Sequence, residues 1–434
     1  METRILIIGT SPYDLNTPAR AFDSYFHFYN RNSLVQFFSA PLNPKPGHCS
    51  SLYRITDYDM LKKWLGDKTA KGKIFEYDDL TINETVFTET KPSLVSKLYS
   101  IGHNKNSLIY LIRGLLWRKT FWCEPELLEW VDTFHPECIF LAFSDDFFIP
   151  RIAYFFSERY QIPIVSCIGD DYYFNYKLSL SPFYHLYKLL YRRLVRKVFH
   201  RPGSAIYIGN KIRDKYNSKF DLDGKTVYLT SQITRRDYKP INLDNPKISY
   251  FGNIRLGRNE SLSEIANALN AINPSYHIDI YTNEKDDKYL SVLDNNANCI
   301  VHGSIPYESV INETLNSDLI LVVEGFKKKD VDISRYSLST KVADSLSSGV
   351  SVFAYGSPEC GAISYAMETG AISTCTSKKQ LESEISKLLY STKLQKQHYF
   401  RAIQVCEMNH TLKNSCKIFE SVVSRTIMET NENE

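Results

Sequence analysis

The chain has few of the features that mark secreted, metal-binding or membrane-spanning proteins. Its nine cysteines include no C-x-x-C pair, and several lie in apolar runs, such as Cys138 in CIFLAF (138–143). This pattern favours free thiols in a reducing compartment over a disulfide framework or a zinc site. No apolar run approaches the roughly 18 residues of a membrane-spanning helix, and the run in METRILIIG (1–9) is too short for a signal peptide. We therefore expect a cytoplasmic protein without a bound metal.

Acidic residues are missing from one long segment. Residues 172–213 hold nine Lys or Arg and no Asp or Glu, although the whole chain has a net charge of only +3. Within this segment, residues 183–201 have the periodicity of an amphipathic helix. Its expected apolar side consists of Phe183, Leu186, Tyr187, Leu190, Leu194 and Val198, and its basic side of Lys188, Arg192, Arg193 and Arg196. A solvated basic face and a contact with an anionic membrane surface both fit this pattern, whereas nothing indicates a nucleic-acid partner.

Strand-like and helix-like segments alternate most regularly in the second half of the chain. The segments expected to form strands are KISYFG (247–252), YHIDIYT (276–282), CIVHG (299–303), DLILVVE (318–324), VSVFAYG (350–356) and AISTCTS (371–377). Helical patterns follow most of them, for example in residues 260–273 and 339–349. Repeated strand–helix units of this length predict an α/β fold with a parallel, doubly wound sheet.

The first half predicts a second domain of the same class. Its expected strands are residues 4–9, 33–40, 138–144, 162–171, 204–210 and 226–232, with longer insertions between them. The stretch 235–246 has two prolines and no apolar periodicity, which is typical of a linker. We therefore predict one domain over 1–240, a second over 241–397 and a final helix over 398–434 that returns to the first. Two such domains would face each other across a ligand-binding cleft.

The turn after the strand 247–252 is a candidate phosphate-binding site. A strand–helix turn that contains Gly252 directs backbone N–H groups and a helix dipole at a ligand above the sheet. Arg255 and Arg258 follow in the same turn, and their guanidinium groups suit a diphosphate. The alternative is an ordinary loop with two exposed arginines.

The helix 339–349 supplies a second candidate. Lys341 and Asp344 lie three residues apart and therefore on one face of this helix. The carboxylate could accept both hydroxyls of a ribose, and the ammonium could meet a phosphate. The alternative is a surface salt bridge of small energetic value.

The stretch KVADSLSSGVSV (341–352) resembles the nucleotide-binding signature of GT-B glycosyltransferases, in particular the group related to glycogen synthase and bacterial polysaccharide transferases. The matching residues are Lys341, Asp344, Gly349 and Val352. The chain departs from the signature at Ser345, usually Tyr, and at Ser351, usually Pro. Tyr336 also replaces the first acid of the paired glutamates in that group, which questions a retaining mechanism. By order of elements, the resemblance covers most of 247–390.

The resemblance implies two Rossmann-like domains that transfer a sugar from a UDP- or GDP-sugar to a glycan or lipid-linked acceptor, as in bacterial surface polysaccharide synthesis. Enzymes of this group generally need no metal and no other cofactor. By position, Glu324 would contact the donor and Glu359 would bind hydroxyls of its sugar. A plain loop carboxylate is an equal alternative for each. A nucleotide-sugar 2-epimerase of the same fold and a non-catalytic scaffold subunit are the alternatives.

An inverting transferase also needs a general base for the acceptor hydroxyl. Aspartates at the carboxyl ends of strands in the first domain are suitable, and we favour Asp170 and Asp171. Asp145 and Asp146 fit helix N-caps better. His103 and His135 are the other candidates, although a surface histidine is the better explanation of each.

Overall fold

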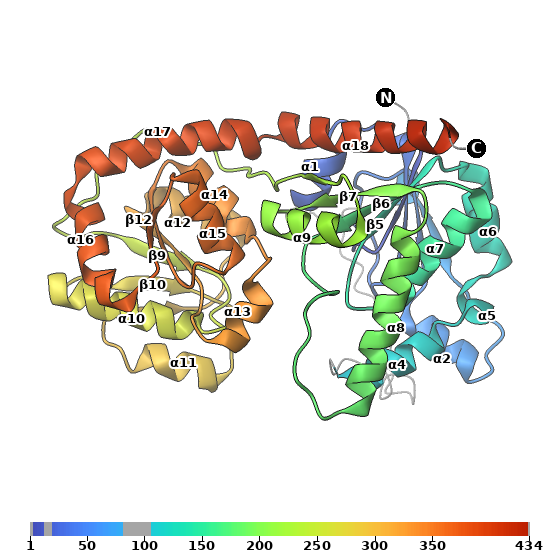
Figure 1. Ribbon diagram of the computed structural model, residues 1–434, viewed down its shortest axis with the longest axis horizontal. Coiled ribbons are helices and arrows are strands. Elements are labelled where there is room, and N and C mark those ends of the chain that lie inside the picture. Colours follow the sequence, from blue (N-terminus) through green and yellow to red (C-terminus); the bar gives the residue numbers. More distant parts are fainter. Residues whose placement is uncertain (1–2, 13–19, 81–105, 433–434) are drawn as a thin grey trace. The chain divides into compact units, whose positions relative to one another are not determined.

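The computed structural model describes residues 3–12, 20–80 and 106–432, and Figure 1 shows the course of its helices and strands. The chain divides into two compact units. Unit 1 comprises Met1–Thr226 together with Cys416–Glu434, and unit 2 comprises Val227–Ser415. Each unit contains one sheet with helices packed against it, so both halves have the predicted α/β architecture.

Unit 1 is built on an eight-stranded sheet with the order β4-β3-β2-β1-β5-β6-β7-β8. All neighbouring strands are parallel except β3 and β4. The strands are β1 (Ile5–Ile8), β2 (Leu34–Phe38), β3 (Ser51–Arg54), β4 (Lys73–Glu76), β5 (Cys138–Ala142), β6 (Ile164–Ile168), β7 (Gly203–Tyr207) and β8 (Lys225–Thr226). Strands β1, β2 and β5 are almost wholly buried, as their apolar sequences require in a sheet covered on both faces.

Nine α-helices of unit 1 lie in the described ranges. They are α1 (Arg20–Phe26), α2 (Asp57–Trp64), α4 (Ser107–Leu116), α5 (Lys119–Trp122), α6 (Pro125–Phe134), α7 (Phe148–Tyr160), α8 (Pro182–Phe199), α9 (Asn210–Phe220) and α18 (Leu412–Glu432). The last of these joins unit 1 from the far end of the chain. Its Phe419 is fully buried against the rings of Tyr25, Phe26 and Phe140.

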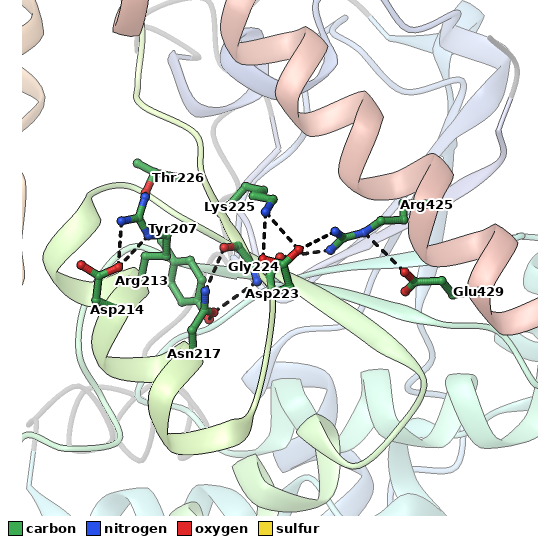
Figure 2. Close-up of polar contacts among 10 residues, drawn as sticks. All are labelled: Tyr207, Arg213, Asp214, Asn217, Asp223, Gly224, Lys225, Thr226, Arg425 and Glu429. Atoms are coloured by element: carbon green, nitrogen blue, oxygen red, sulfur yellow. Dashed lines mark hydrogen bonds and ion pairs between the residues drawn. The ribbon is translucent and has the colours of Figure 1, made fainter.

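Polar contacts also attach α18 to unit 1 (Figure 2). Arg425 donates to a carboxylate oxygen of Asp223 at 2.6 Å and to its backbone carbonyl at 3.0 Å. Lys225 contacts the same carboxylate at 2.8 Å, and Asn217 fixes the adjacent turn by donating to Gly224 O at 3.0 Å. The loop before β8 is therefore one polar attachment point of the terminal helix, and Cys416 provides another by donating from Sγ to Asp23 O at 3.3 Å.

Unit 2 contains a six-stranded, fully parallel sheet with the order β11-β10-β9-β12-β13-β14. Its strands are β9 (Ile248–Phe251), β10 (Ile278–Tyr281), β11 (Cys299–His302), β12 (Leu319–Val323), β13 (Ser351–Tyr355) and β14 (Ser373–Cys375). Its helices are α10 (Arg258–Ile272), α11 (Asp287–Asp294), α12 (Tyr307–Asn316), α13 (Lys328–Ser334), α14 (Thr340–Ser348), α15 (Gly361–Thr369), α16 (Leu381–Tyr390) and α17 (Thr392–Asn409). This is the strand order of the dinucleotide-binding fold, in which the direction of winding reverses between β9 and β12.

Two expectations about the end of the first domain differ from the structure. The strand expected over 226–232 is only the two-residue β8, and residues 227–232 form no regular element. The boundary expected at 240/241 falls inside unit 2, because Arg236 N donates to Ser348 O at 3.0 Å and Ile241 N to the buried Gln395 at 3.3 Å. The final segment expected over 398–434 is divided between the units at Ser415/Cys416.

The buried side of α8 differs from the expected one. Phe183, Leu186 and Leu190 were expected to face the core but are exposed, whereas Lys188 of the expected basic side is buried. The buried stripe is rich in tyrosine, and its polar ends bind the loops that follow the strands. Tyr187 OH donates to Asp145 O at 2.6 Å, and Lys188 Nζ donates to Tyr172 O at 3.0 Å. These contacts orient the helix, which a count of apolar residues could not foresee.

None of the helices in the described ranges has the length and apolar character needed to cross a bilayer. All nine cysteines are free thiols, and six of them are buried.

Candidate functional site

The reversal point of the unit 2 sheet brings the strongest sequence candidates together. In doubly wound sheets, ligands bind outside the carboxyl ends of the strands at this point. Gly252 directly follows β9, Glu324 directly follows β12, and Arg258 is the first residue of α10. Lys341 lies in the first turn of α14, which precedes β13. Four of the seven predicted donor-site residues therefore converge here.

Gly252 provides the space for the Lys341 side chain. The glycine has φ +124°, and a Cβ atom on it would lie 1.9 Å from Lys341 Nζ and 2.3 Å from Cε. Any larger residue would displace the lysine, which lies with its ammonium 5.2 Å from the centre of the Tyr250 ring. The N–H of Gly252 donates to Tyr281 O at 2.8 Å, so it does not point at a ligand as expected.

Glu324 and Arg258 form a buried, bidentate ion pair. Arg258 Nη2 lies 2.8 Å and 3.0 Å from the two carboxylate oxygens of Glu324, and Nε lies 3.1 Å from one of them. The Glu324 side chain is only 4% exposed, and its backbone carbonyl accepts a 2.9 Å hydrogen bond from Ser261 Oγ. Planar two-point pairing of this kind fixes the direction of the guanidinium group.

Lys341 is the uncompensated charge of this group. In the part of the chain that the structure describes, its ammonium has neither a hydrogen bond nor an ion pair, although Arg258 and Glu324 act on it electrostatically. Burial and the positive Arg258 lower the pKa of Lys341 to about 8. Burial also raises the pKa of Glu324, against the opposing effect of Arg258. Protonated Lys341, Arg258 and one carboxylate leave an excess positive charge, which an anionic ligand would neutralise.

Asp344 lies in the same helix as Lys341 but has a different contact. Its side chain is buried, and Oδ1 accepts a 2.7 Å hydrogen bond from Ser231 Oγ. Ser231 lies in the irregular segment that precedes unit 2's first strand. The surface salt bridge considered for Lys341 and Asp344 is not formed.

Two predicted donor-site residues lie in separate ion pairs. Arg255 is exposed and forms a two-point pair with Glu284, with a distance of 2.9 Å from Nη2 to Oε1. This pairing, above all the hydrogen bond, lowers the pKa of Glu284 to about 2. Glu359 is also exposed and lies 2.8 Å from Arg335.

The candidate bases of unit 1 have unequal surroundings. Asp171 Oδ1 accepts hydrogen bonds from Phe174 N at 2.8 Å, Tyr216 OH at 2.9 Å and Tyr173 N at 3.1 Å. Burial raises the pKa of Asp171 despite these donors. Asp170 is exposed. The one structural role of Asp171 is therefore to hold the turn after β6.

The other candidate residues of unit 1 correct two sequence interpretations. The N-cap of α7 is Phe147 without a side-chain hydrogen bond, so neither Asp145 nor Asp146 caps that helix. Asp145 accepts from Tyr110, and Asp146 pairs with Arg113. His135 ends α6 in the left-handed conformation and precedes β5, at the opposite edge of the sheet from the strand ends. His103 lies outside the described residues.

Some participating residues had no recognisable sequence signal. Tyr250, beneath the Lys341 ammonium, looks like any inward-facing strand residue, and Ser231, the partner of Asp344, lies in a stretch expected to be a strand. Across 3–12, 20–80 and 106–432, no three His, Cys, Asp or Glu side chains are grouped closely enough to hold a metal ion.

Comparisons with known proteins identify the fold. No family model matches the chain, and no curated protein matches it by sequence. The solved structures that match over nearly their whole length include HepE, OtsA and sucrose-phosphate synthase. HepE of Anabaena, crystallised with UDP and glucose, has a TM-score of 0.57 at 12% identity over 97% of this chain and 99% of its own.

The second, OtsA in its apo form, has a TM-score of 0.56 at 10% identity over 98% of this chain and 99% of its own. The third, sucrose-phosphate synthase from Thermosynechococcus elongatus, has a TM-score of 0.52 at 8% identity over 99% and 98%. At these identities the likeness is one of architecture, and it agrees with the two doubly wound units described above. The chain has the GT-B fold.

Proposed function

We propose that the protein is a glycosyltransferase that moves a sugar from a nucleoside diphosphate donor to a glycan or lipid-linked acceptor, in the synthesis of a bacterial surface polysaccharide. The observation that carries this proposal is the Lys341 ammonium, which lies without an anionic partner across Gly252 at the reversal point of a GT-B sheet. A diphosphate carries the negative charge that would compensate this ammonium. The HepE structures with UDP and with UDP-glucose support a uridine nucleotide as the first donor to test.

In this proposal the diphosphate contacts Lys341 directly. It also contacts Arg258, through the edge of the guanidinium group that Glu324 does not occupy. Glu324 fixes Arg258 in place and contacts the donor only at the edge of the pair. Asp344 shares its carboxylate between Ser231 and a ribose hydroxyl, which its four lone-pair positions permit. To contact the donor, Arg255 would have to break its ion pair with Glu284. Glu359 would likewise have to break its ion pair with Arg335.

The acceptor belongs to unit 1 in this proposal. Asp170 is the better general base of the two predicted aspartates, because the turn after β6 already uses Asp171. A base at Asp170 would deprotonate the acceptor hydroxyl as it attacks the anomeric carbon, and the nucleoside diphosphate would leave with the bonding electrons. This assignment applies to inversion of the anomeric centre.

Nucleotide release from UDP- and GDP-sugars, measured with and without extracted lipid acceptor, tests the proposal. Release that depends on the acceptor, with the sugar recovered on the lipid, supports a transferase. If an epimeric nucleotide-sugar forms without acceptor, the protein is a nucleotide-sugar 2-epimerase and not a transferase. If calorimetry detects no nucleotide binding at all, the non-catalytic scaffold subunit is the alternative that remains.

The pH dependence of UDP binding should report the titration of Lys341. A diphosphate binds the charged lysine, and its own last ionisation is complete above a pH of about 6–7. Affinity should therefore be constant up to about pH 7.5. Above the Lys341 pKa of about 8 it should fall by roughly tenfold per pH unit, because binding must then take up a proton.

Calorimetry at a series of pH values checks this expectation, and it should also show proton uptake at pH 9. The Lys341→Met variant is the control, since its weaker affinity should not change over the same range. An affinity of the wild-type protein that is flat to pH 9.5 would remove Lys341 from the diphosphate site.

Turnover should not need a divalent metal. Lys341 and Arg258 would supply the positive charge that a metal provides in other transferases. We expect the rate to be unchanged by an excess of EDTA. Activity that EDTA abolishes and that magnesium or manganese restores would contradict this prediction.

A further inference from the structure

An exposed apolar surface lies on unit 1 and shares no residue with the proposed donor site. Two helices and one loop form it. We call this surface the apolar edge, and its most exposed members are Ile112, Leu115, Leu178, Leu180, Leu186 and Leu189, each at least 46% exposed. Leu178 and Leu180, in the loop before α8, are completely exposed.

The helices that carry the apolar edge are packed together by their opposite sides. Figure 1 shows α4 beside the first half of α8, and the rings of Tyr110 and Tyr187 stack between them at 5.1 Å. Tyr187 and Tyr191 bind the loop after β5 through their hydroxyls. Because the tyrosines fill the inner side, the leucines of α8 and the Ile112/Leu115 stripe of α4 can only face outward. A water-exposed apolar surface of this kind marks a binding face.

The charged residues of the segments that form the apolar edge have one sign. Residues 106–119 and 172–201, which form it, contain no Asp or Glu. Exposed basic residues follow the leucines along α8, at Arg193, Arg196 and Lys197, and Arg118 and Lys119 follow the apolar stripe of α4. Three acids that contact α4 are bound by its polar side chains: Asp145 by Tyr110, and Asp146 and Asp57 by Arg113. Both helices thus change from apolar to cationic along their length.

We propose that the apolar edge inserts into the interface of an anionic lipid bilayer. Leu178 and Leu180 enter the boundary of the acyl chains, to a depth of about 5–10 Å. Arg193, Arg196 and Lys197 then meet the anionic headgroups. An apolar tip bordered by cations matches a lipid leaflet in both respects. From the sequence, Leu186 and Leu190 were expected to pack in the core, so a membrane contact would have been purely electrostatic. In the structure these leucines are exposed and can enter the bilayer.

Sedimentation of the full-length protein with vesicles tests this proposal. We expect the protein to pellet with vesicles of phosphatidylcholine and phosphatidylglycerol at low salt. A substantial fraction should still pellet at about 1 M salt, where the Debye length is only about 3 Å. Purely electrostatic adsorption would be reversed at this salt concentration. Complete release of the protein from the vesicles would therefore contradict insertion of the leucines.

Two sets of substitutions separate the contributions. Leu178→Gln with Leu180→Gln should weaken binding roughly tenfold or more and abolish the salt-resistant fraction. Arg193→Gln, Arg196→Gln and Lys197→Gln together should reduce binding to anionic vesicles to the level seen with phosphatidylcholine alone. The matched control, Leu65→Gln with Met428→Gln, removes two other exposed apolar side chains of unit 1 and should bind like the wild-type protein.

The proposal fails if the leucine variant pellets like the wild-type protein. It also fails if the wild-type protein ignores vesicles and instead self-associates through these leucines, because the apolar edge would then be a protein interface. UDP affinity measured without lipid should be the same in all these proteins. A loss of nucleotide binding would count against the donor site and not against the membrane surface.

Discussion

Replacement of Lys341 by methionine is expected to weaken UDP binding by about 1.5–3 kcal/mol, which is roughly 10- to 150-fold. Methionine keeps the length and apolar stem of the side chain, so the packing over Gly252 and Tyr250 should be preserved. Only the ammonium is lost, and with it the one charge of the site that lacks an anionic partner. Isothermal titration calorimetry at pH 7 measures the effect.

The matched control is Lys329→Met, which removes an exposed lysine from α13 of the same unit. It should bind UDP like the wild-type protein, because a general decrease in positive charge acts weakly through solvent. Equal affinity of the Lys341 variant and the wild-type protein, in a chain that circular dichroism shows to be folded, would place the nucleotide elsewhere.

Replacement of Arg258 by methionine is expected to lower the free energy needed to open the unit 2 sheet by about 3–5 kcal/mol. The substitution leaves the nearly inaccessible Glu324 carboxylate without its partner, and an unpaired buried charge is strongly destabilising. Hydrogen exchange of peptides that cover β9 and β12 measures this opening. Arg255→Met is the control. The Arg255 side chain is 51% exposed, against 16% for Arg258, so water can replace it beside Glu284 and its loss should change the exchange of these strands much less.

The cost should depend on pH in a defined direction. Without Arg258, burial still raises the folded pKa of Glu324 above the unfolded value, and the weaker effect of Lys341 is the opposing influence that remains. A carboxyl group with a raised folded pKa favours the folded state at low pH and loses that contribution as pH rises. The variant should therefore regain stability between pH 7 and pH 5. The double variant Arg258→Met/Glu324→Gln should be more stable than the single variant at pH 7, and equal stabilities would contradict a buried charge as the cause.

The sequence predicted the fold well because both sheets are built from local strand–helix units. Runs such as DLILVVE have one strong physical explanation, a strand covered on both faces, and β12 lies within that run. The end of the first domain was predicted poorly for the opposite reason. Residues 235–246 have no apolar periodicity, and contacts with residues far along the chain, such as Ser348 and Gln395, determine their position.

The candidate site was predictable where the position of a residue near the edge of the sheet determines its location. It was unpredictable where an ion-pair partner determines the orientation of the side chain. Gly252 and Glu324 come together because parallel strands end at one edge of the sheet, and Lys341 reaches the same edge from the first turn of α14. Arg255 and Arg258 look equivalent in the sequence, three residues apart in one turn. Only the fold shows that Glu284 binds the first at the surface and Glu324 binds the second in the interior. Long-range pairs of this kind leave no local pattern.

The placement of Phe419 and Arg425 in unit 1 has a consequence for biosynthesis. The rings of Tyr25, Phe26 and Phe140 leave the ribosome early, but the ring that covers them follows only after the whole of Val227–Ser415. Unit 2, whose chain is continuous, can therefore finish folding while unit 1 still exposes an aromatic surface. Incomplete domains with exposed apolar surface are the species that aggregate and that chaperones bind. The nascent chain should thus depend on chaperones most during synthesis of its second half, and release of α18 should end that dependence.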